Sequence, residues 1–207
     1  MMVRSPWRTL LYDALAQVEL SGEVIDLGGS RKSEYIHNLK GQHSLTMANL
    51  EAEAAGDMKL DLEKPFAITN DKYDAVLCIN VLEHIYNYQN VISETRRILK
   101  SGGKAVFAVP FLVQVHPSPN DHWRFTGDTL ERLFKNAGFS EVKVEPIGEG
   151  VLTATAQIKF NLLHFSLVRL VVIKCANFVD RIFSGLIKSK MYSRDYYPLG
   201  YVVTARK

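Results

Sequence analysis

The stretch YDAVLCINVLEHIYNYQNVISETRRILKSGG, residues 73–103, decides the fold of this chain. It begins with an almost unbroken apolar run over residues 73–79, the pattern of a central parallel strand that is buried on both faces. Residues 91–100 then carry apolar side chains at helical spacing, and Gly102 and Gly103 end the segment. A buried strand, an amphipathic helix and a glycine turn in this order are typical of a parallel α/β sheet.

The same alternation continues in both directions from this stretch. Short β-rich runs predict further strands, and apolar residues at helical spacing predict the helices between them. The expected strands are 23–27, 44–48, 58–62, 104–109, 140–147 and 199–205, and the expected helices are 7–20, 31–40 and 126–137. We therefore predict an α/β fold with a doubly wound, mostly parallel seven-stranded sheet. At about 150 residues per domain, residues 1–207 form a single domain.

Composition excludes several classes of protein. The hydrophobic fraction of 47% is ordinary for a folded domain and too high for a disordered chain. Cys78 and Cys175 lie far apart without metal-ligand spacing, which supports neither a disulfide framework nor a zinc knuckle. A net charge of +3 is too small to indicate nucleic acid as a partner. No secretory signal is visible at residues 1–7, so we expect a cytoplasmic protein.

Residues 151–190 form an apolar and basic segment before the last expected strand. Its charged residues are six bases against one acid: Lys159, Arg169, Lys174, Arg181, Lys188 and Lys190 against Asp180. Polar residues recur at helical spacing, so we expect a helical insertion. Its wide apolar face has two interpretations: a helix pair that packs on the sheet or forms a homodimer interface, or an interfacial helix at the inner face of an anionic membrane. Its apolar run is too short and too often interrupted to cross a bilayer.

The first expected strand ends in VIDLGGS, residues 24–30. In doubly wound sheets, ligands bind at the carboxyl ends of the strands. Gly28 and Gly29 would let the backbone approach a ligand closely, although a tight strand-to-helix turn would also use them. The carboxylate of Asp26 is suited to a cationic ligand group rather than to a pyrophosphate. This segment alone leaves both interpretations open.

The order of the remaining motifs is more specific. Besides residues 73–103, the chain has the pairs Asp61-Leu62 and Gly28-Gly29 and the triplet AGF at 137–139. In this order they resemble the class I S-adenosylmethionine-dependent methyltransferases, specifically the small type 11 group, over residues 24–139. The resemblance implies a Rossmann-like methyltransferase fold and an enzyme that uses S-adenosylmethionine (SAM) and releases S-adenosylhomocysteine (SAH).

The resemblance implies cofactor-binding residues at the first two strand ends. Asp26, Gly28 and Gly29 fall on the motif that lies against the methionine part of the cofactor. The family places an acid at the end of the second strand to bind both ribose hydroxyls. The candidates here are Asn49, which is nearer the strand end, and Glu51, which has the carboxylate, and both remain open.

Three more residues match the family's cofactor site. Asp61 falls where the family accepts a hydrogen bond from the adenine amino group, and Leu62 would pack on the ring. Asn80 would lie beside the amino acid portion of the cofactor. The family's glycine motif usually reads Gly-x-Gly-x-Gly, whereas Ser30 and Lys32 replace its second and third glycines here.

Residues 116–126, HPSPNDHWRFT, follow the strand 104–109. They resemble a pattern of type 11 enzymes that are encoded with glycan and cell-envelope pathways. An oxygen acceptor needs a base, and histidine titrates near neutral pH, so His116 and His122 are the candidate bases. Asp121 and Arg124 are further catalytic candidates, although their spacing also allows a local ion pair that holds the loop.

We predict no metal site. Some relatives hold a divalent metal with Glu-x-x-Glu-His, but Asn80 replaces the first acid here, which removes an anionic ligand. Glu83 and His84 recur across the family whatever the acceptor, so their expected role is structural or close to the cofactor.

The leading functional hypothesis is methyl transfer to an oxygen or nitrogen of a small molecule, such as a glycan or envelope intermediate. One alternative is a quinone or lipid-like acceptor at the membrane surface. Another is a cofactor-binding but inactive module that serves as a partner of another enzyme. Nucleic acid is not expected as a partner, because the basic residues lie on an apolar helix rather than in an aromatic groove.

Overall fold

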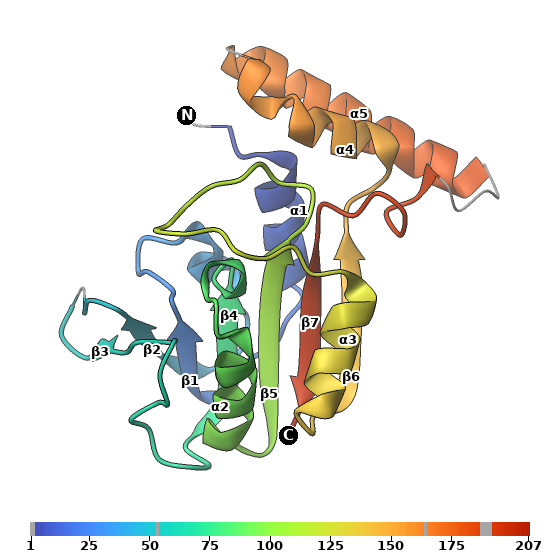
Figure 1. Cartoon of the computed structure of the whole chain (residues 1–207). Helices are drawn as coiled ribbons and strands as arrows, with labels where there is room; N and C mark the ends of the chain where they lie inside the picture. The colour runs from blue at the N-terminus through green and yellow to red at the C-terminus, as the bar shows by residue number, and fades with distance from the viewer. Residues whose placement is uncertain (1–2, 53, 164, 187–191) are drawn as a thin grey trace.

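The computed structural model describes residues 3–52, 54–163, 165–186 and 192–207 and contains the predicted mixed sheet (Figure 1). The strands lie in the order β3-β2-β1-β4-β5-β7-β6. Their bounds are β1 Gly22–Leu27, β2 His43–Asn49, β3 Met58–Lys59, β4 Tyr73–Ile79, β5 Leu99–Pro110, β6 Ser140–Ile147 and β7 Gly200–Arg206. Only β7 runs antiparallel to its neighbours β5 and β6, which confirms a doubly wound, mostly parallel seven-stranded sheet.

The strand order reverses between β1 and β4. The chain moves outward from β1 to β2 and β3, then returns to β4 and continues through β5 to the other edge. Such a reversal opens a crevice outside the carboxyl ends of the strands, where doubly wound proteins bind their ligands. The sheet topology therefore places the predicted site between β1 and β4.

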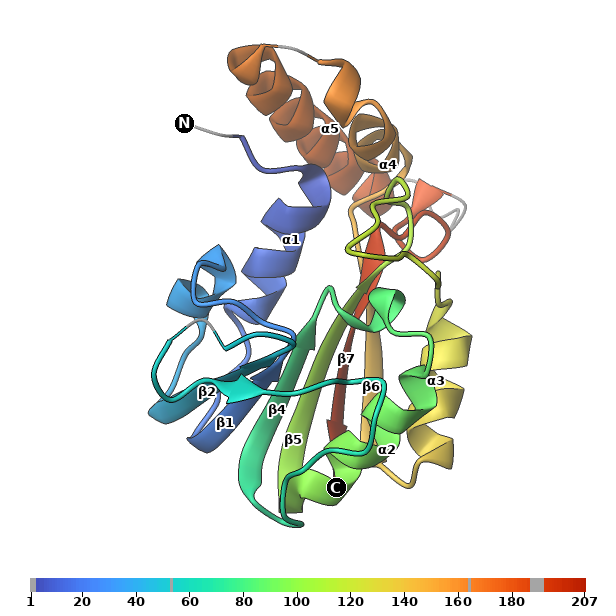
Figure 2. The same cartoon turned by 60° about the vertical axis from the view of Figure 1, so that its left-hand side comes forward.

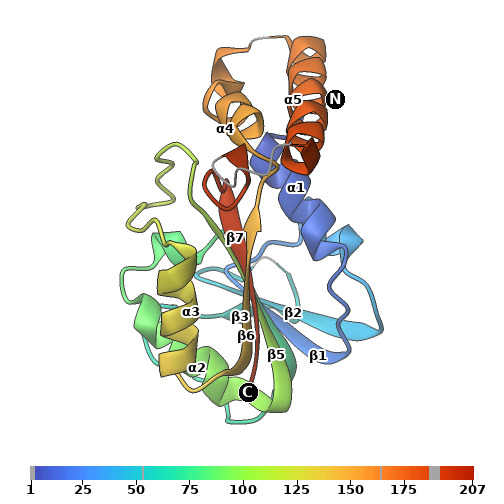
Figure 3. The ribbon, with the colours of Figure 1, turned by 90° about the vertical axis from the view of Figure 1, so that its right-hand side faces the viewer.

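Helices cover both faces of the sheet (Figure 3). The helices α2 (Tyr88–Ile98) and α3 (Gly127–Asn136) pack on one face, in the larger hydrophobic cluster, and α1 (Pro6–Leu15) packs on the other. The side chain of Ser5 caps α1 and that of Thr126 caps α3, each by accepting a hydrogen bond from a main-chain N–H of the first turn. Hydrophobic burial on both faces accounts for the nearly continuous apolar strands.

The chain after β1 differs from the sequence prediction. A helix was expected over residues 31–40, but only a short 3₁₀ helix, η1 (Glu34–Asn38), forms there. The Ser30 hydroxyl accepts a hydrogen bond from the main-chain N–H of Lys32, a local turn that competes with helix formation. Tyr35 is buried against the sheet and holds this segment close to β1. The predicted strand over residues 58–62 is also shorter, because only β3 pairs with β2.

The segment before β7 is helical, as predicted. It contains α4 (Val151–Ile158), the 3₁₀ turn η3 (Phe160–Leu162) and α5 (Ser166–Leu186), while residues 187–190 lie outside the described part of the chain. Figures 1 and 2 show α4 and α5 side by side beyond the carboxyl ends of β5 and β6. Asp180, the one acid of the segment, accepts hydrogen bonds from the main-chain N–H groups of Leu152 and Thr153. It thereby joins α5 to the amino end of α4.

This helical hairpin leaves much apolar surface exposed. The exposed apolar side chains of α5 and of the turn before it include Phe165, Leu167, Val171, Phe178 and Phe183. Large apolar side chains left exposed together on one element are typical of contact sites for proteins, lipids or ligands. Within the described residues, no helix is long and apolar enough to span a bilayer.

Candidate functional site

The carboxyl ends of three neighbouring strands form the candidate cofactor edge. Leu27 at the end of β1 lies opposite Ala48 of β2, and Asp26 lies opposite Leu77 of β4. The residues that follow these strands therefore emerge side by side at the point where the strand order reverses. They include three of the predicted cofactor residues, Gly28, Gly29 and Asn80, and a fourth, Asn49, is the last residue of β2.

Asp26 lies beneath this edge and is fully buried. Its Oδ2 accepts a hydrogen bond of 2.5 Å from the Tyr35 hydroxyl, whereas its Oδ1 has no partner among the described residues. Burial raises the pKa of the Asp26 carboxyl from 3.8 to about 7, and the hydrogen bond from Tyr35 opposes part of that rise. The carboxyl is thus placed under the glycine turn, with one oxygen still able to take a donor.

The two glycines of the turn are sterically required. Gly28 has a φ of +75°, and a Cβ there would lie 2.6 Å from Val81. A Cβ at Gly29 would lie 2.3 Å from the carboxylate of Asp26. The turn therefore brings bare backbone to the cofactor edge, as a close approach to a ligand needs.

The structure separates the two ribose candidates. Asn49 donates from its side-chain amide to the carbonyl of Gly29 at 3.4 Å, so it lies against the glycine turn. Glu51 is exposed and pairs with Lys59 at 3.0 Å. Asn49 therefore contacts the glycine turn, whereas Glu51 pairs with a residue of β3.

Asp61 and Leu62 occupy the segment after β3. Leu62 is buried in the larger hydrophobic cluster. Asp61 pairs with Lys64 at 2.8 Å and accepts from the main-chain N–H of Glu63, and these contacts hold the pKa of its carboxyl below the usual value. Asp61 is therefore an ionised hydrogen-bond acceptor at neutral pH.

Asn80 ends β4 in the left-handed backbone region, with a φ of 55°. Among residues other than glycine, asparagine adopts this region most readily, and such conformations cluster at functional sites. Its Oδ1 accepts a hydrogen bond of 3.0 Å from the indole N–H of Trp7 in α1. Trp7 was not predicted, because it lies far from Asn80 in the sequence and a tryptophan near the start of a helix is ordinarily a core residue.

An ion pair closes the loop of residues 111–126. Arg124 donates to both carboxylate oxygens of Asp121, at 2.5 and 2.7 Å, and these hydrogen bonds hold the pKa of Asp121 far below its usual range. The main-chain N–H of His116 donates to the same carboxylate at 2.9 Å. Asp121 and Arg124 thus hold the backbone of His116 in place, as the ion-pair interpretation of their spacing expected.

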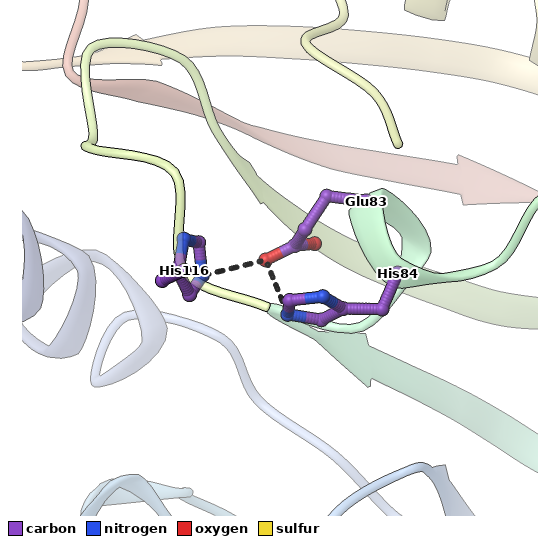
Figure 4. Close-up of side chains that lie close together, drawn as sticks. All are labelled: Glu83, His84 and His116. Carbon is purple, nitrogen blue, oxygen red and sulfur yellow. Dashed lines mark ion pairs between the residues drawn. The ribbon is translucent and has the colours of Figure 1, made fainter. Parts of the chain in front are cut away.

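His116 meets two residues of the turn after β4 (Figure 4). The Nε2 atoms of His116 and His84 lie 3.8 and 3.7 Å from Oε1 of Glu83. Glu83 is fully buried, and neither carboxylate oxygen has a hydrogen-bond partner among the described residues. Burial raises the pKa of this carboxyl to about 8. The sequence assigned Glu83 and His84 a structural or cofactor-proximal role and did not join them to His116.

His122, the other candidate base, lies on the outer side of the same loop. Its main-chain N–H donates to the carbonyl of Glu83 at 2.8 Å, which pins the loop to the turn after β4. Its exposed ring meets Tyr86 edge-on at 5.4 Å. Trp123 packs between Tyr86 and Tyr88 and donates to the carbonyl of Ile85, so it anchors the loop.

Comparisons with known proteins identify the family. A family profile described as "Methyltransferase domain" matches residues 3–144. The chain belongs to the methyltransferase domain family. This membership confirms the predicted class I SAM-dependent methyltransferase domain and SAM as its cofactor.

Solved structures share the fold of this methyltransferase domain. A chain of the Haloferax volcanii complex between the Trm112 methyltransferase activator and a methyltransferase is 15% identical, with a TM-score of 0.60, over 95% of this chain and 88% of that one. A SAM-dependent methyltransferase from Archaeoglobus fulgidus is 16% identical, with a TM-score of 0.57, over 98% of this chain and 92% of that one. The Burkholderia thailandensis 1,6-didemethyltoxoflavin-N1-methyltransferase is 15% identical, with a TM-score of 0.54, over 89% of this chain and 70% of that one.

One curated protein is closer in sequence over a short stretch. An uncharacterized protein of Methanocaldococcus jannaschii is 50% identical over 48 residues, which is 23% of this chain. The match spans only 20% of that protein's length.

Proposed function

We propose that residues 1–207 act as one methyltransferase domain that transfers the methyl group of SAM to an oxygen or nitrogen of a small molecule. The proposed acceptor class is a glycan or cell-envelope intermediate, and the proposed location is the cytoplasm. One observation supports this reaction most strongly. The Gly28-Gly29 turn, Asn49 and Asn80 lie together at one edge of the sheet, in a chain of the methyltransferase domain family.

Donor binding is assigned residue by residue. Asp26, Gly28 and Gly29 would hold the methionine part, and Asn49 the ribose, with Glu51 as the less favoured candidate. Asp61 would accept from the adenine amino group, Leu62 would pack on the ring and Asn80 would contact the amino acid portion. The exposed side chain of Lys32 does not crowd the turn, which supports binding despite the altered glycine motif.

The acceptor would bind beyond the sulfonium, under the loop 111–126 and the hairpin α4–α5. Both elements leave the sheet at its carboxyl edge, and Asn161 of η3 donates to Gln114 of the loop. In-line placement of the acceptor next to an already activated methyl group supplies much of the rate. His116 or His122 would take the acceptor's proton, and Asp121 and Arg124 would position His116.

A labelled methyl group tests the acceptor class. Purified protein is incubated with methyl-labelled SAM and a small-molecule extract of the source cells, and the products are partitioned between water and organic solvent. Label in water-soluble sugar-containing products supports the proposal. Label confined to the organic phase refutes a polar acceptor, and no transfer to either fraction refutes the reaction.

The exposed hairpin favours a second candidate, a quinone or lipid-like acceptor at the inner face of a membrane. Apolar side chains of α5 are exposed, and so are the basic residues Lys174 of the same helix and Lys159 at the end of α4. Attachment to anionic vesicles should occur at low salt and weaken at 1 M salt, where the screening length falls to about 3 Å. Vesicle sedimentation measures it. Absence of sedimentation at low salt leaves homodimerisation or a protein partner as the role of the hairpin.

A further inference from the structure

The carboxylate of Glu83 is the least satisfied polar group in the described core. It is fully buried, and no other described residue donates a hydrogen bond to either oxygen. A buried polar group without a partner costs free energy, and a buried charge costs more, so native proteins pair such groups or bind a cation with them. The groups nearest to Glu83 decide between a pairing partner and a bound cation.

Two imidazole nitrogens face the same carboxylate oxygen. The distances from Oε1 are 3.7 Å to Nε2 of His84 and 3.8 Å to Nε2 of His116. These distances are too long for hydrogen bonds. Ligand bonds of about 2.0–2.2 Å at tetrahedral angles put ligand atoms about 3.3–3.6 Å apart. The two distances from Glu83 Oε1 are thus within a few tenths of an ångström of this spacing, and the three donor atoms all lie within 4.8 Å of one another.

The other ring nitrogen of each histidine fixes its tautomer. Nδ1 of His84 lies 2.5 Å from the carbonyl oxygen of Asn120, and Nδ1 of His116 lies 3.0 Å from that of Gln114. A carbonyl oxygen only accepts hydrogen bonds, so in the neutral ring each Nδ1 carries the proton and each Nε2 keeps a lone pair for a ligand. Histidines that bind metals are oriented in this way by an acceptor on the far nitrogen.

Asp121 adds a second acceptor behind His116. Its Oδ2 lies 3.3 Å from Nδ1 of His116, and Arg124 holds its carboxylate in place. A carboxylate behind a histidine raises the basicity of the ligating nitrogen. Asp121 is almost inaccessible and lies in the loop 111–126, which thus supplies the support that a ligating histidine needs.

We propose that Glu83, His84 and His116 bind one divalent transition-metal ion, with Zn²⁺ as the best match. Two imidazoles and one carboxylate are a donor set that Zn²⁺ prefers, and Mg²⁺ prefers oxygen ligands. Three protein ligands leave a fourth position for water or substrate, and the His116 side chain is 36% exposed. This proposal departs from the expectation of no metal, which rested on Asn80 and did not include His116.

The catalytic use of the ion rests on the proposed function, whereas its binding does not. A metal-bound acceptor oxygen would lose its proton more readily. Nε2 of His116 cannot bind the ion and accept a proton at the same time. In the metal-loaded protein, His122 is therefore the remaining base of the loop.

Calorimetric titration of Zn²⁺ into the chelator-treated full chain tests the site. The expected result is one ion per chain, with affinity falling more than about 100-fold in Glu83→Gln, His84→Ala and His116→Ala, a larger loss than supporting residues cause. His37→Ala removes an exposed histidine elsewhere on the surface and should bind Zn²⁺ as the wild type does. Glu83→Gln keeps the shape of the side chain, and thermal unfolding checks that each variant folds.

Two results would overturn the proposal: no saturable Zn²⁺ binding by the wild type, or wild-type affinity in Glu83→Gln and His116→Ala. Either would mean that the three side chains meet without an ion. A parallel titration of SAH into the same protein reports on the donor site alone. A failure of the metal site is therefore distinguishable from a failure of the proposed function.

Discussion

Replacing Asp26 with asparagine should remove a pH dependence of folding stability. Asp26 is fully buried, and its pKa rises from 3.8 to about 7 because burial disfavours the charged form. A carboxyl with a raised folded-state pKa holds its proton more tightly in the folded than in the unfolded chain. Its stabilising contribution is therefore complete below about pH 4, declines as the pH rises to about 7, and stays lost above that.

The magnitude follows from the pKa difference. A pKa that rises from 3.8 to about 7, at 1.36 kcal/mol for each pH unit between them, corresponds to about 4 kcal/mol over the whole range. Part of this loss is already present at pH 5, where an unfolded aspartate is mostly ionised. Between pH 5 and pH 9, the expected change is about 2–3 kcal/mol, most of it below pH 7.

Urea unfolding of the cofactor-free wild type and Asp26→Asn at pH 5, 7 and 9 measures this change. The free energy of unfolding of the asparagine variant should rise relative to the wild type by about 2–3 kcal/mol across that range. The comparison cancels other titrating groups, including Glu83. Tyr35→Phe removes the hydroxyl but keeps the carboxyl, so it should retain the pH dependence. A pH-independent difference between wild type and Asp26→Asn would mean that the pKa of Asp26 is not raised in the folded chain.

Three further changes test the site. Asp61→Ala should weaken SAM binding about 10- to 100-fold in calorimetry, the loss expected for a ligand hydrogen bond, and an unchanged affinity would place the adenine elsewhere. Gly29→Ala should lower the melting temperature, because the new Cβ would lie 2.3 Å from the carboxylate of Asp26, and an unchanged temperature would contradict that packing. Once an acceptor is found, His116→Ala or His122→Ala should lower kcat by about 10²–10⁴ with SAM affinity unchanged; full turnover in both would exclude a histidine base.

The strands of the sheet were predictable because the hydrophobic pattern of each one lies within a short stretch of sequence. Each strand is an apolar run, and β4 is nearly uniform because both faces of a central strand are buried. The reversal between β1 and β4 follows from the family resemblance and could not be derived from apolar runs alone. The expected helix over residues 31–40 failed because the Ser30 turn and the burial of Tyr35 outweighed its helical spacing.

The contacts around the candidate site were harder to predict because they join distant segments. The cofactor edge was expected from the order of Asp26, Asn49 and Asn80, since neighbouring parallel strands end together. The hydrogen bond from Trp7 to Asn80 joins residues 73 positions apart, and no local sequence pattern predicts it. The ion pair between Asp121 and Arg124 was suggested by their spacing, but the direction of the His116 ring depends on how the whole loop packs.

The carboxyl edge of β1, β2 and β4 is where we expect the cofactor of this methyltransferase domain to bind. Calorimetric titration of SAH into the purified wild-type chain tests it most directly, because it needs neither an acceptor nor a metal. We expect saturable binding of one SAH per chain. No heat of binding and no thermal shift at millimolar SAH would contradict it.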